Sequence, residues 1–479
     1  MDWTHARRRF AFLAEALEGV GGFAPVTHWT LLQSADLNAV PPVPARHGYS
    51  LSGPSHLIRY PRESDDKFAA RNALAVYENH LAEACERFTG FLSRKAPSRL
   101  NADSPFVSLM VADADMRGST LDVFFSHFAR QARARGSMLL VLDTPDDQPL
   151  NLADQIARRA VPYLRACEPE RVTAFDLDPS SGLFRSVSFE SEEVADGKVK
   201  CVIRTYDAEG WSIADERGNV IRAGVHAFGA CPVLAFTETG GLFPVVGVYA
   251  QIADLSRDLF NLASELREQE RATCFPLLHM QVPPEHASQF NGARTAAVIG
   301  AHSIIVHSGD APGFISPDGA SADVLMKTIA AREASIKRIS KDDAAGAGTT
   351  QAESGEAKRR RFEELNSQLA TFARGLQSLE VRMWTLFHRA IGQAPRLRVE
   401  WPTDFNLADT LAELDILTMM QSTGFPPAAL TAKREAIAGQ EFDAADPATK
   451  ETVLAAIREQ AQQNQTGGLP GGQMNNPAA

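Results

Sequence analysis

Apolar residues at helical spacing make residues 350–391 the longest regular element predicted in the chain. Successive apolar positions there are three or four residues apart, so all of them lie on one face of a helix. They are Phe362, Leu365, Leu369, Phe372, Leu376, Leu379, Met383 and Leu386. Thr350 and Glu353 have capping-box spacing, while Gly392 and Pro395 are typical of a helix end. The pattern predicts a helix of about 41 residues, roughly 60 Å long, and leaves open whether it is a core helix or part of a coiled coil.

Two more amphipathic stretches lie near the start of the chain. Trp3, Phe10, Leu13 and Leu17 share one helical face, and the glycines of residues 19–22 end that helix. A phosphate-binding glycine loop opens a helix after a strand, so this loop is not expected to bind phosphate. Residues 64–91 have a second apolar face and are predicted to form one continuous helix.

The period of the apolar pattern changes between residues 137 and 236. Short segments rich in β-branched residues alternate there with turn residues, which is typical of antiparallel strands. The predicted strands are residues 138–142, 199–206, 211–214, 220–222 and 233–236. Together with the preceding helices, these strands predict an α+β body.

A second regular helix follows this body and leads to a small module. Ile252, Leu255, Leu259, Leu262 and Leu266 repeat the spacing of three and four. The proline-containing residues 274–318, with a strand-like core at 296–307, separate this helix from another predicted helix at 322–340. Residues 341–349 are mostly small and are predicted to form a loop that leads into the long helix.

The last part of the chain is predicted to be helical with a disordered end. A short strand at residues 397–401 precedes helices at 407–422, 428–437 and 447–462. Residues 463–479 consist mainly of Gly, Pro, Asn and Gln and are predicted to be disordered.

Composition narrows the possible classes of function. The 479 residues carry 48 basic and 59 acidic side chains, and the net charge of −11 disfavours tight binding to nucleic acid. It still allows DNA to move along a surface without adhering to it. No apolar run approaches the ~18 residues of a membrane span, so no contact with a membrane is expected. Glu15 and Glu18 interrupt what would otherwise resemble a twin-arginine export signal, and five scattered cysteines predict neither a disulfide framework nor a zinc cluster.

One short motif suggests an enzyme. Residues 106–112 are apolar and are predicted to form a strand that ends at Asp113-Ala114-Asp115. Carboxylates at alternate positions can converge on a divalent cation, so a metal-dependent glycosyl- or phosphotransferase using Asp113 and Asp115 is one hypothesis. The favoured interpretation is a turn that Gly118 ends, with Ser119 or Thr120 capping a helix at residues 121–135.

Several local motifs accompany the order of elements described above. Residues 59–65 are Arg-Tyr-Pro-Arg-Glu-Ser-Asp, followed by Arg71 and Asn79, and residues 90–97 are Gly-Phe-Leu-Ser-Arg-Lys-Ala-Pro. Asp-Met-Arg-Gly-Ser-Thr-Leu at 115–121, Phe-Pro-Val-Val at 243–246 and Thr-Gln-Ala at 350–352 complete the set. These motifs, with the order body, helix, module, helix, loop, long helix and helical cluster, resemble the portal proteins of tailed double-stranded DNA bacteriophages. The resemblance covers about residues 60–462.

The resemblance implies a structural role in a virus particle. It implies a ring of about twelve copies at one vertex of the virion capsid, assembled in the host cytoplasm. Double-stranded DNA enters such a ring under the action of the large terminase subunit and leaves through it into the tail. A head-completion or adaptor protein and the major capsid protein are further implied partners. No catalytic residue, cofactor, metal or membrane contact is implied.

The resemblance also implies a division of the chain. Residues 1–250 correspond to the wing, 251–272 to the first stem helix, 273–322 to the clip, 323–340 to the second stem helix, 341–349 to the tunnel loop, 350–402 to the long wing helix and a strand, 403–462 to a helical crown and 463–479 to a disordered tail.

Three groups of residues become candidate functional sites. Lys341, Asp342, Asp343 and Thr349 are expected to face DNA in the channel. Contacts between subunits along the stem are expected from Arg257, Asp258, Glu265, Arg267, Glu268 and Arg271. A basic run, Lys358, Arg359, Arg360 and Arg361, has no counterpart in the family pattern. It is either a solvated helix face or a contact with DNA phosphate or with acidic side chains of a neighbouring subunit.

Overall fold

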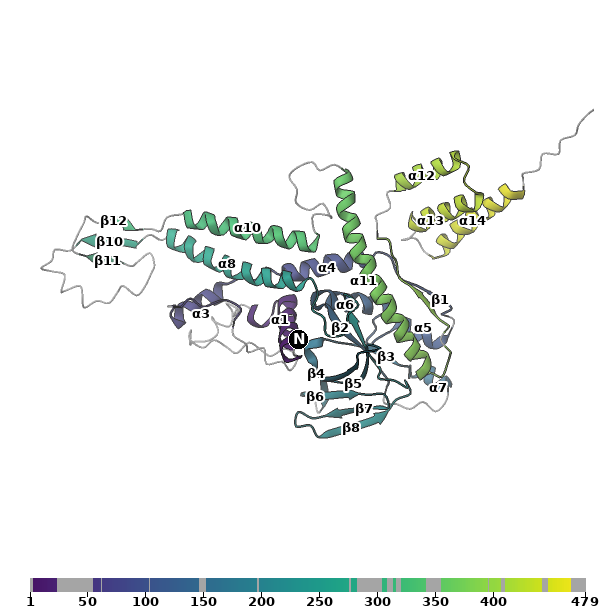
Figure 1. The fold of residues 1–479 in the computed structure, drawn as a ribbon, viewed down its shortest axis with the longest axis horizontal. Coiled ribbons are helices and arrows are strands. Elements are labelled where there is room, and N and C mark those ends of the chain that lie inside the picture. The colour runs from purple at the N-terminus through teal and green to yellow at the C-terminus, as the bar shows by residue number, and fades with distance from the viewer. Residues whose placement is uncertain are drawn as a thin grey trace, which may run out of the picture. The chain divides into compact units, whose positions relative to one another are not determined.

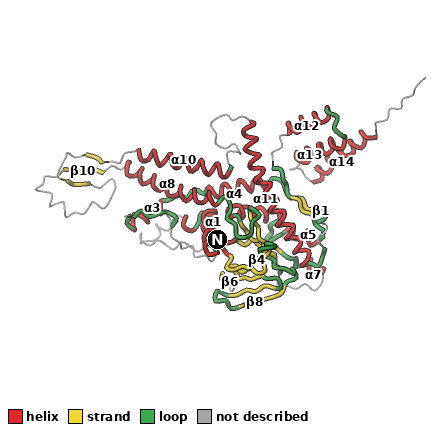
Figure 2. Tube along the Cα trace, viewed as in Figure 1, coloured by secondary structure: helices red, strands yellow, loops and turns green. Residues whose placement is uncertain are grey.

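The computed structural model describes residues 3–23, 55–61, 63–102, 104–145, 152–195, 198–274, 277–281, 304–307, 313–315, 320–341, 355–394, 396–405, 410–441 and 447–466. The chain forms two compact units, Met1–Phe405 and Asn406–Ala479. Helices and antiparallel strands occur together in the first unit, which confirms the α+β class (Figure 2).

A buried three-stranded sheet lies at the centre of the first unit. Its order is β3-β2-β9, with β2 (Ser137–Asp143) between β3 (Tyr163–Cys167) and β9 (Val233–Thr237), and every residue of β2 is buried. Helix α6 (Leu121–Arg135) leads into β2 through Gly136, which has a φ of 86°. A Cβ atom on Gly136 would lie 2.0 Å from the backbone nitrogen of Gly247, so only glycine fits at this turn.

A five-stranded antiparallel sheet packs beside it. The strands follow chain order: β4 (Val172–Asp178), β5 (Leu183–Ala195), β6 (Lys198–Tyr206), β7 (Gly210–Ala214) and β8 (Val220–Val225). Val187, Phe189 and Tyr206 are buried on the face toward the three-stranded sheet. The five predicted strands of this region are confirmed, although they belong to two sheets, and β3, β4 and β5 were not predicted.

Two predicted elements are wrong. The single helix predicted for residues 64–91 is two helices, α3 (Asp65–Leu74) and α4 (His80–Leu92), because Ala75 is extended and Asn79 caps α4 by accepting a hydrogen bond from the Ala82 amide. The strand predicted for residues 106–112 is helix α5 (Pro105–Ala112). Proline at the first helical position and the helical spacing of buried Phe106 and Met110 explain this outcome.

The long helix α11 (Gly355–Ala390) contains 36 residues, which corresponds to roughly 54 Å. Its predicted apolar face is buried from Leu365 to Leu386, and Gly392 follows the helix with a φ of 68°. The ring of Phe372 lies 5.3 Å from that of Phe88 and 4.9 Å from that of Phe236. The apolar face therefore packs into the core of the same chain, which favours the core-helix interpretation over a coiled coil. Thr350, Glu353 and Pro395 lie outside the described residues.

Within the first unit, a pair of helices extends from the α+β body and carries a small sheet (Figure 1). Helix α8 (Ala250–Cys274) leads to β10 (Leu277–Gln281), β11 (Ile304–His307) and β12 (Gly313–Ile315), which form a sheet of order β11-β10-β12. Helix α10 (Ala320–Ser340) returns beside α8. The first residues of α8 pack with α1 (Trp3–Glu18) and α4 in one apolar cluster. The predicted order of helix, small strand-containing module and helix is confirmed.

Short elements complete the described chain. Strand β1 (Ser98–Leu100) pairs with β13 (Arg398–Glu400), and α7 (Leu152–Ala157) is a short helix. The second unit contains α12 (Thr410–Ser422), α13 (Pro427–Glu441) and α14 (Pro447–Thr466), as predicted. Helix α14 extends past residue 462, so the predicted disordered tail begins too early. Residues 467–479 lie outside the described residues.

Candidate functional site

The α8–α10 helix pair is fixed to the body at its base, and an ion pair joins the two helices. Tyr249 donates a hydrogen bond to the carbonyl oxygen of Ser340 at 3.4 Å, and Arg332 Nε lies 2.7 Å from Asp258 Oδ2. The first contact joins the residue before α8 to the last residue of α10, and the second joins Asp258 to the earlier Arg332, so the helices are antiparallel. Ile252, Leu259 and Ile336 are buried at the base, whereas most of the remaining length of α10 is exposed.

A polar cluster contacts the middle of α8. This cluster, the clasp, consists of Glu63, Arg71 and Ser264. The Arg71 guanidinium binds both carboxylate oxygens of Glu63 at 2.9 Å and donates to Ser264 Oγ at 3.2 Å. The side chains of Arg71 and Glu63 are 3% and 1% exposed. Asn261 of α8 accepts a hydrogen bond from the Ile58 amide at 2.7 Å. The segment that carries the Arg-Tyr-Pro-Arg-Glu-Ser-Asp motif therefore fixes the position of α8.

The hydrogen bond from Arg71 is the main reason why the pKa of Glu63 lies below its ordinary value. A depressed folded-state pKa contributes stability that is complete above the unfolded-state pKa and is lost as the pH falls through the folded-state value. We expect Glu63→Gln to lower the free energy of unfolding at pH 7 by about 2 kcal/mol, because a buried charged hydrogen bond is weakened. The difference from wild type, measured by urea unfolding, should shrink as the pH is lowered below 4.5.

Glu83→Gln provides the matched control for this prediction. Glu83 is 62% exposed and pairs with Arg87 on the surface of α4. A surface pair of this kind contributes only about 0.3–0.5 kcal/mol. An equal loss of stability in both variants, or a difference for Glu63→Gln that does not depend on pH, would contradict the role assigned to the clasp.

The two helices of the pair carry opposite net charge. Helix α8 has five acidic and three basic side chains, a net charge of −2, whereas α10 has two acidic and four basic side chains, a net charge of +2. Lys327, Lys337 and Arg338 are exposed on α10. Val324 and Met326 on the same helix are 63% and 48% exposed. The uncovered side of α10 is thus basic with exposed apolar side chains.

The six stem residues predicted to contact a neighbouring subunit have different surroundings within one chain. Asp258 pairs with Arg332, Glu268 Oε2 lies 3.5 Å from Lys67 Nζ, and Arg267 donates to the Leu74 carbonyl. The Arg257 guanidinium lies 5.2 Å from the centre of the Phe12 ring. Glu265 is half-buried and Arg271 is exposed. Their pairing between subunits stays a prediction.

The loop predicted to face DNA is described at its first residue. Lys341 follows α10 with a φ of 60°, and its Nζ lies 2.5 Å from Glu364 Oε2 on α11. The hydrogen bond from Lys341 and its positive charge lower the pKa of Glu364. Asp342, Asp343 and Thr349 lie outside the described residues. Lys358, Arg359, Arg360 and Arg361 are helical in the backbone of α11, and their side chains lie outside the described part.

The Asp113-Ala114-Asp115 motif forms a turn. Asp113 Oδ1 accepts hydrogen bonds from the amides of Arg117 and Gly118 at 3.1 and 2.9 Å, and Asp115 Oδ1 accepts from Arg117 and Ser119. Asp113 Oδ2 lies 2.8 Å from Arg159 Nη1. Thr120 caps α6, as the turn interpretation predicts. No group of three or more potential metal-ligating side chains occurs in the described ranges.

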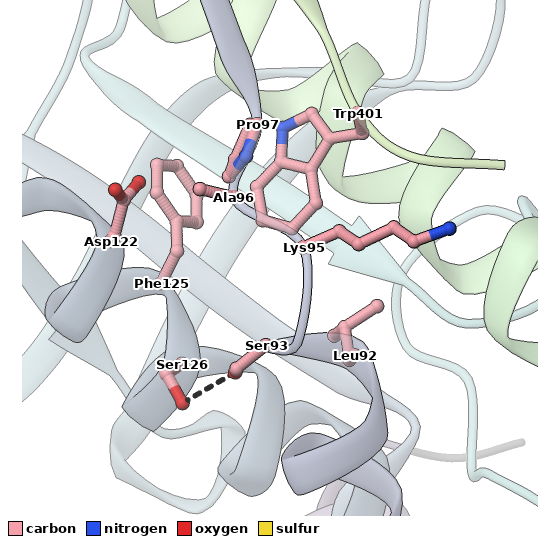
Figure 3. A pocket seen from close by; sticks show the side chains of 9 residues that line it. All are labelled: Leu92, Ser93, Lys95, Ala96, Pro97, Asp122, Phe125, Ser126 and Trp401. Atoms are coloured by element: carbon pink, nitrogen blue, oxygen red, sulfur yellow. Dashed lines mark hydrogen bonds between the residues drawn. The ribbon is translucent and has the colours of Figure 1, made fainter. Parts of the chain in front are cut away.

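A small pocket lies where the predicted Gly-Phe-Leu-Ser-Arg-Lys-Ala-Pro motif meets α6 and Trp401 (Figure 3). Ser93 and Ser126 are joined there by a hydrogen bond of 3.1 Å. The pocket volume of about 60 Å³ is well below the roughly 300 Å³ at which ligand pockets usually begin. None of the helices in the described chain combines the length and apolarity that a membrane span needs.

One buried polar centre was missed in the sequence. Glu380 is 0% exposed and accepts hydrogen bonds from Arg99 Nε at 2.6 Å, Trp384 Nε1 at 3.1 Å and Trp401 Nε1 at 2.7 Å. These contacts join α11 to β1 and to the residue after β13. Helical spacing from Leu376 and Met383 places Glu380 on the apolar face of α11. A carboxylate at such a position indicates a buried polar group, so the sequence alone could have predicted this centre.

Comparisons with known proteins give distant structural similarities. The chain is similar to one in the virion of a native gene transfer agent particle, with 12% identity, coverage of 73% of this chain and 87% of that chain, and a TM-score of 0.38. It is also similar to a HK97 family phage portal protein from Corynebacterium diphtheriae, with 11% identity, coverage of 70% of this chain and 93% of that chain, and a TM-score of 0.36. A chain in the neck of the native gene transfer agent particle, computed with C12 symmetry, is similar with 11% identity, coverage of 75% of this chain and 89% of that chain, and a TM-score of 0.36. No family model and no curated protein matches the chain. Similarities at this level do not decide its function.

Proposed function

We propose that copies of this chain assemble into a ring that forms a DNA channel at one capsid vertex. The single observation that carries the proposal is the α8–α10 pair, which extends from the body with oppositely charged helices and an uncovered face on α10. In a cyclic ring, each subunit presents two different surfaces to its two neighbours. Helix α8 of one copy against α10 of the next gives complementary charge at every interface.

The rest of the chain supports this arrangement. Helix α11 follows α10 in the chain, and its apolar face is buried in the core of the body. The net charge of −11 suits a channel along which a polyanion moves, because repulsion limits adhesion while a few cations such as Lys341 moderate it. In the proposed ring, residues 1–250 form the wing, α8 and α10 the stem, β10 to β12 the clip and α12 to α14 the crown.

A DNA channel at a capsid vertex requires three kinds of protein partner. The large terminase subunit binds the clip end and drives double-stranded DNA inward, a head-completion or adaptor protein continues the channel, and the major capsid protein surrounds the wing. The chain itself catalyses no reaction in this proposal. The metal-dependent transferase hypothesis gains no support, because Asp113 and Asp115 are engaged by their own turn and follow a helix instead of a strand.

Charge reversal on α10 tests the proposed interface. Arg338→Glu should raise the protein concentration needed for half-assembly by at least about tenfold, because each interface loses an attraction and gains a repulsion. Size-exclusion chromatography with light scattering measures this concentration. High salt should weaken assembly of the wild type in the same assay, because salt screens exposed charges.

Arg217→Glu is the control for this experiment. Arg217 is exposed in the turn between β7 and β8 and undergoes the same change of charge. It should assemble like the wild type. Equal effects of the two substitutions would show that total charge, and not the α8–α10 interface, governs assembly.

A further inference from the structure

Four buried arginine side chains among the described residues each bind a carboxylate. Arg71 pairs with Glu63, Arg99 with Glu380, Arg133 with Glu238 and Arg135 with Glu170, each inside the first unit. Leaving a charge buried without such a partner is strongly destabilising. Arg382 of α11 differs from these four arginines.

Arg382 has no such partner among the described residues. Its Nη2 atom is buried and has no hydrogen-bond acceptor there, and burial lowers the pKa of its guanidinium. Arg382 lies on α11, two residues from Glu380, and close to the exposed side of the helix. An acceptor from outside the described residues would satisfy this unused donor.

The side chain lines a hollow between α11, the turn after β9 and the turn between β4 and β5. The hollow has a volume of about 370 Å³. Gly240 and Gly241 form part of its wall, and no side chain narrows the hollow at those two positions. The hydroxyl groups of Ser378, Ser180 and Thr237 on the wall already donate hydrogen bonds to Arg374, Asp178 and Gly241. Arg382 therefore offers an entering anion a side-chain donor that no acceptor among the described residues uses.

We infer that this hollow receives an acidic side chain from a second copy of the chain, which forms an ion pair with Arg382. The inference rests on the proposed ring, since it needs a neighbouring copy. The planar guanidinium matches a carboxylate through two parallel hydrogen bonds. With 59 acidic side chains against 48 basic ones, the surface of a neighbouring copy is rich in carboxylates. Binding of DNA phosphate is disfavoured because Arg382 is the one cationic side chain among the described residues that line the hollow.

Zero-length carbodiimide coupling of assembled Arg382→Lys tests the inference. A lysine amine reacts with an adjacent carboxylate to form an amide, whereas a guanidinium does not. We expect a crosslinked peptide that joins position 382 of one copy to an Asp or Glu of another, and mass spectrometry identifies that residue. Mixing copies with heavy and light nitrogen isotopes distinguishes a product between copies from one within a copy.

Arg374→Lys is the matched control, because Arg374 is exposed on the same helix two turns earlier. It should give no dominant crosslink, and Arg382→Gln should give none at position 382. A product within one copy, or none from intact rings of Arg382→Lys, would overturn the inference and leave the proposed ring standing. Saturable binding of inorganic phosphate to wild type that Arg382→Gln abolishes, without a crosslink between copies, would also overturn it. Failure of the wild type to assemble would remove both proposals.

Discussion

Replacing Glu380 with alanine is expected to lower the free energy of unfolding by about 3–5 kcal/mol, since it leaves the buried Arg99 guanidinium without its main carboxylate. The same change removes the acceptor for the indole N–H groups of Trp384 and Trp401. Helix α11 would then lose its polar link to β1 and β13. Urea unfolding followed by tryptophan fluorescence measures the loss, because both indoles lie at the altered site.

Glu363→Ala on the same helix is the control for this prediction. Glu363 is exposed, so its removal should change stability by less than about 0.5 kcal/mol. A loss below about 1 kcal/mol for Glu380→Ala would mean that the hydrogen bonds around it are worth no more than a single neutral one. That outcome would contradict the role assigned to Glu380.

Leu369→Pro is expected to prevent ring assembly altogether. Leu369 is 0% exposed at the middle of α11, and proline there removes a helical hydrogen bond and clashes with the preceding turn, at a cost of about 3 kcal/mol or more. Loss of the buried leucine side chain adds to this cost. Light scattering should then detect no assembled species at concentrations where the wild type assembles.

Leu369→Met tests whether the effect comes from the break in the helix. Methionine fills a similar volume and should cost less than about 1.5 kcal/mol, so assembly should persist. Rings of normal mass from Leu369→Pro would show that α11 does not act as a continuous rod.

The spacing of apolar residues predicted most helices correctly. It did not predict where a capping side chain divides one helix into two. The apolar face of α11 was predicted residue by residue because spacing alone determines which side chains share a face. The break between α3 and α4 was missed because residues 75–79 keep the apolar rhythm, while Asn79 caps the second helix and donates to the Leu17 carbonyl. That donor acts across the fold, so its effect cannot be found in a local window.

In the candidate site, likewise, the order of the elements was predictable from the sequence and the contacts of individual side chains were not. The order of α8, the small sheet, α10 and α11 followed from local patterns. The surroundings of individual charges did not, because α1 and α3 pack beside α8 and supply Phe12 and Lys67 to residues that the sequence alone leaves unpaired. The clasp of Arg71 on Glu63 and Ser264 joins positions up to 193 residues apart, so sequence spacing carries no signal for it.

Electron microscopy of the purified chain tests the central claim most directly. The proposed assembly predicts closed rings with an axial opening, built from many copies of the 52.0 kDa chain, with the α8–α10 pairs of neighbouring copies side by side around the opening. A particle with the mass of one chain at every protein and salt concentration, or an assembly without an axial opening, would contradict it.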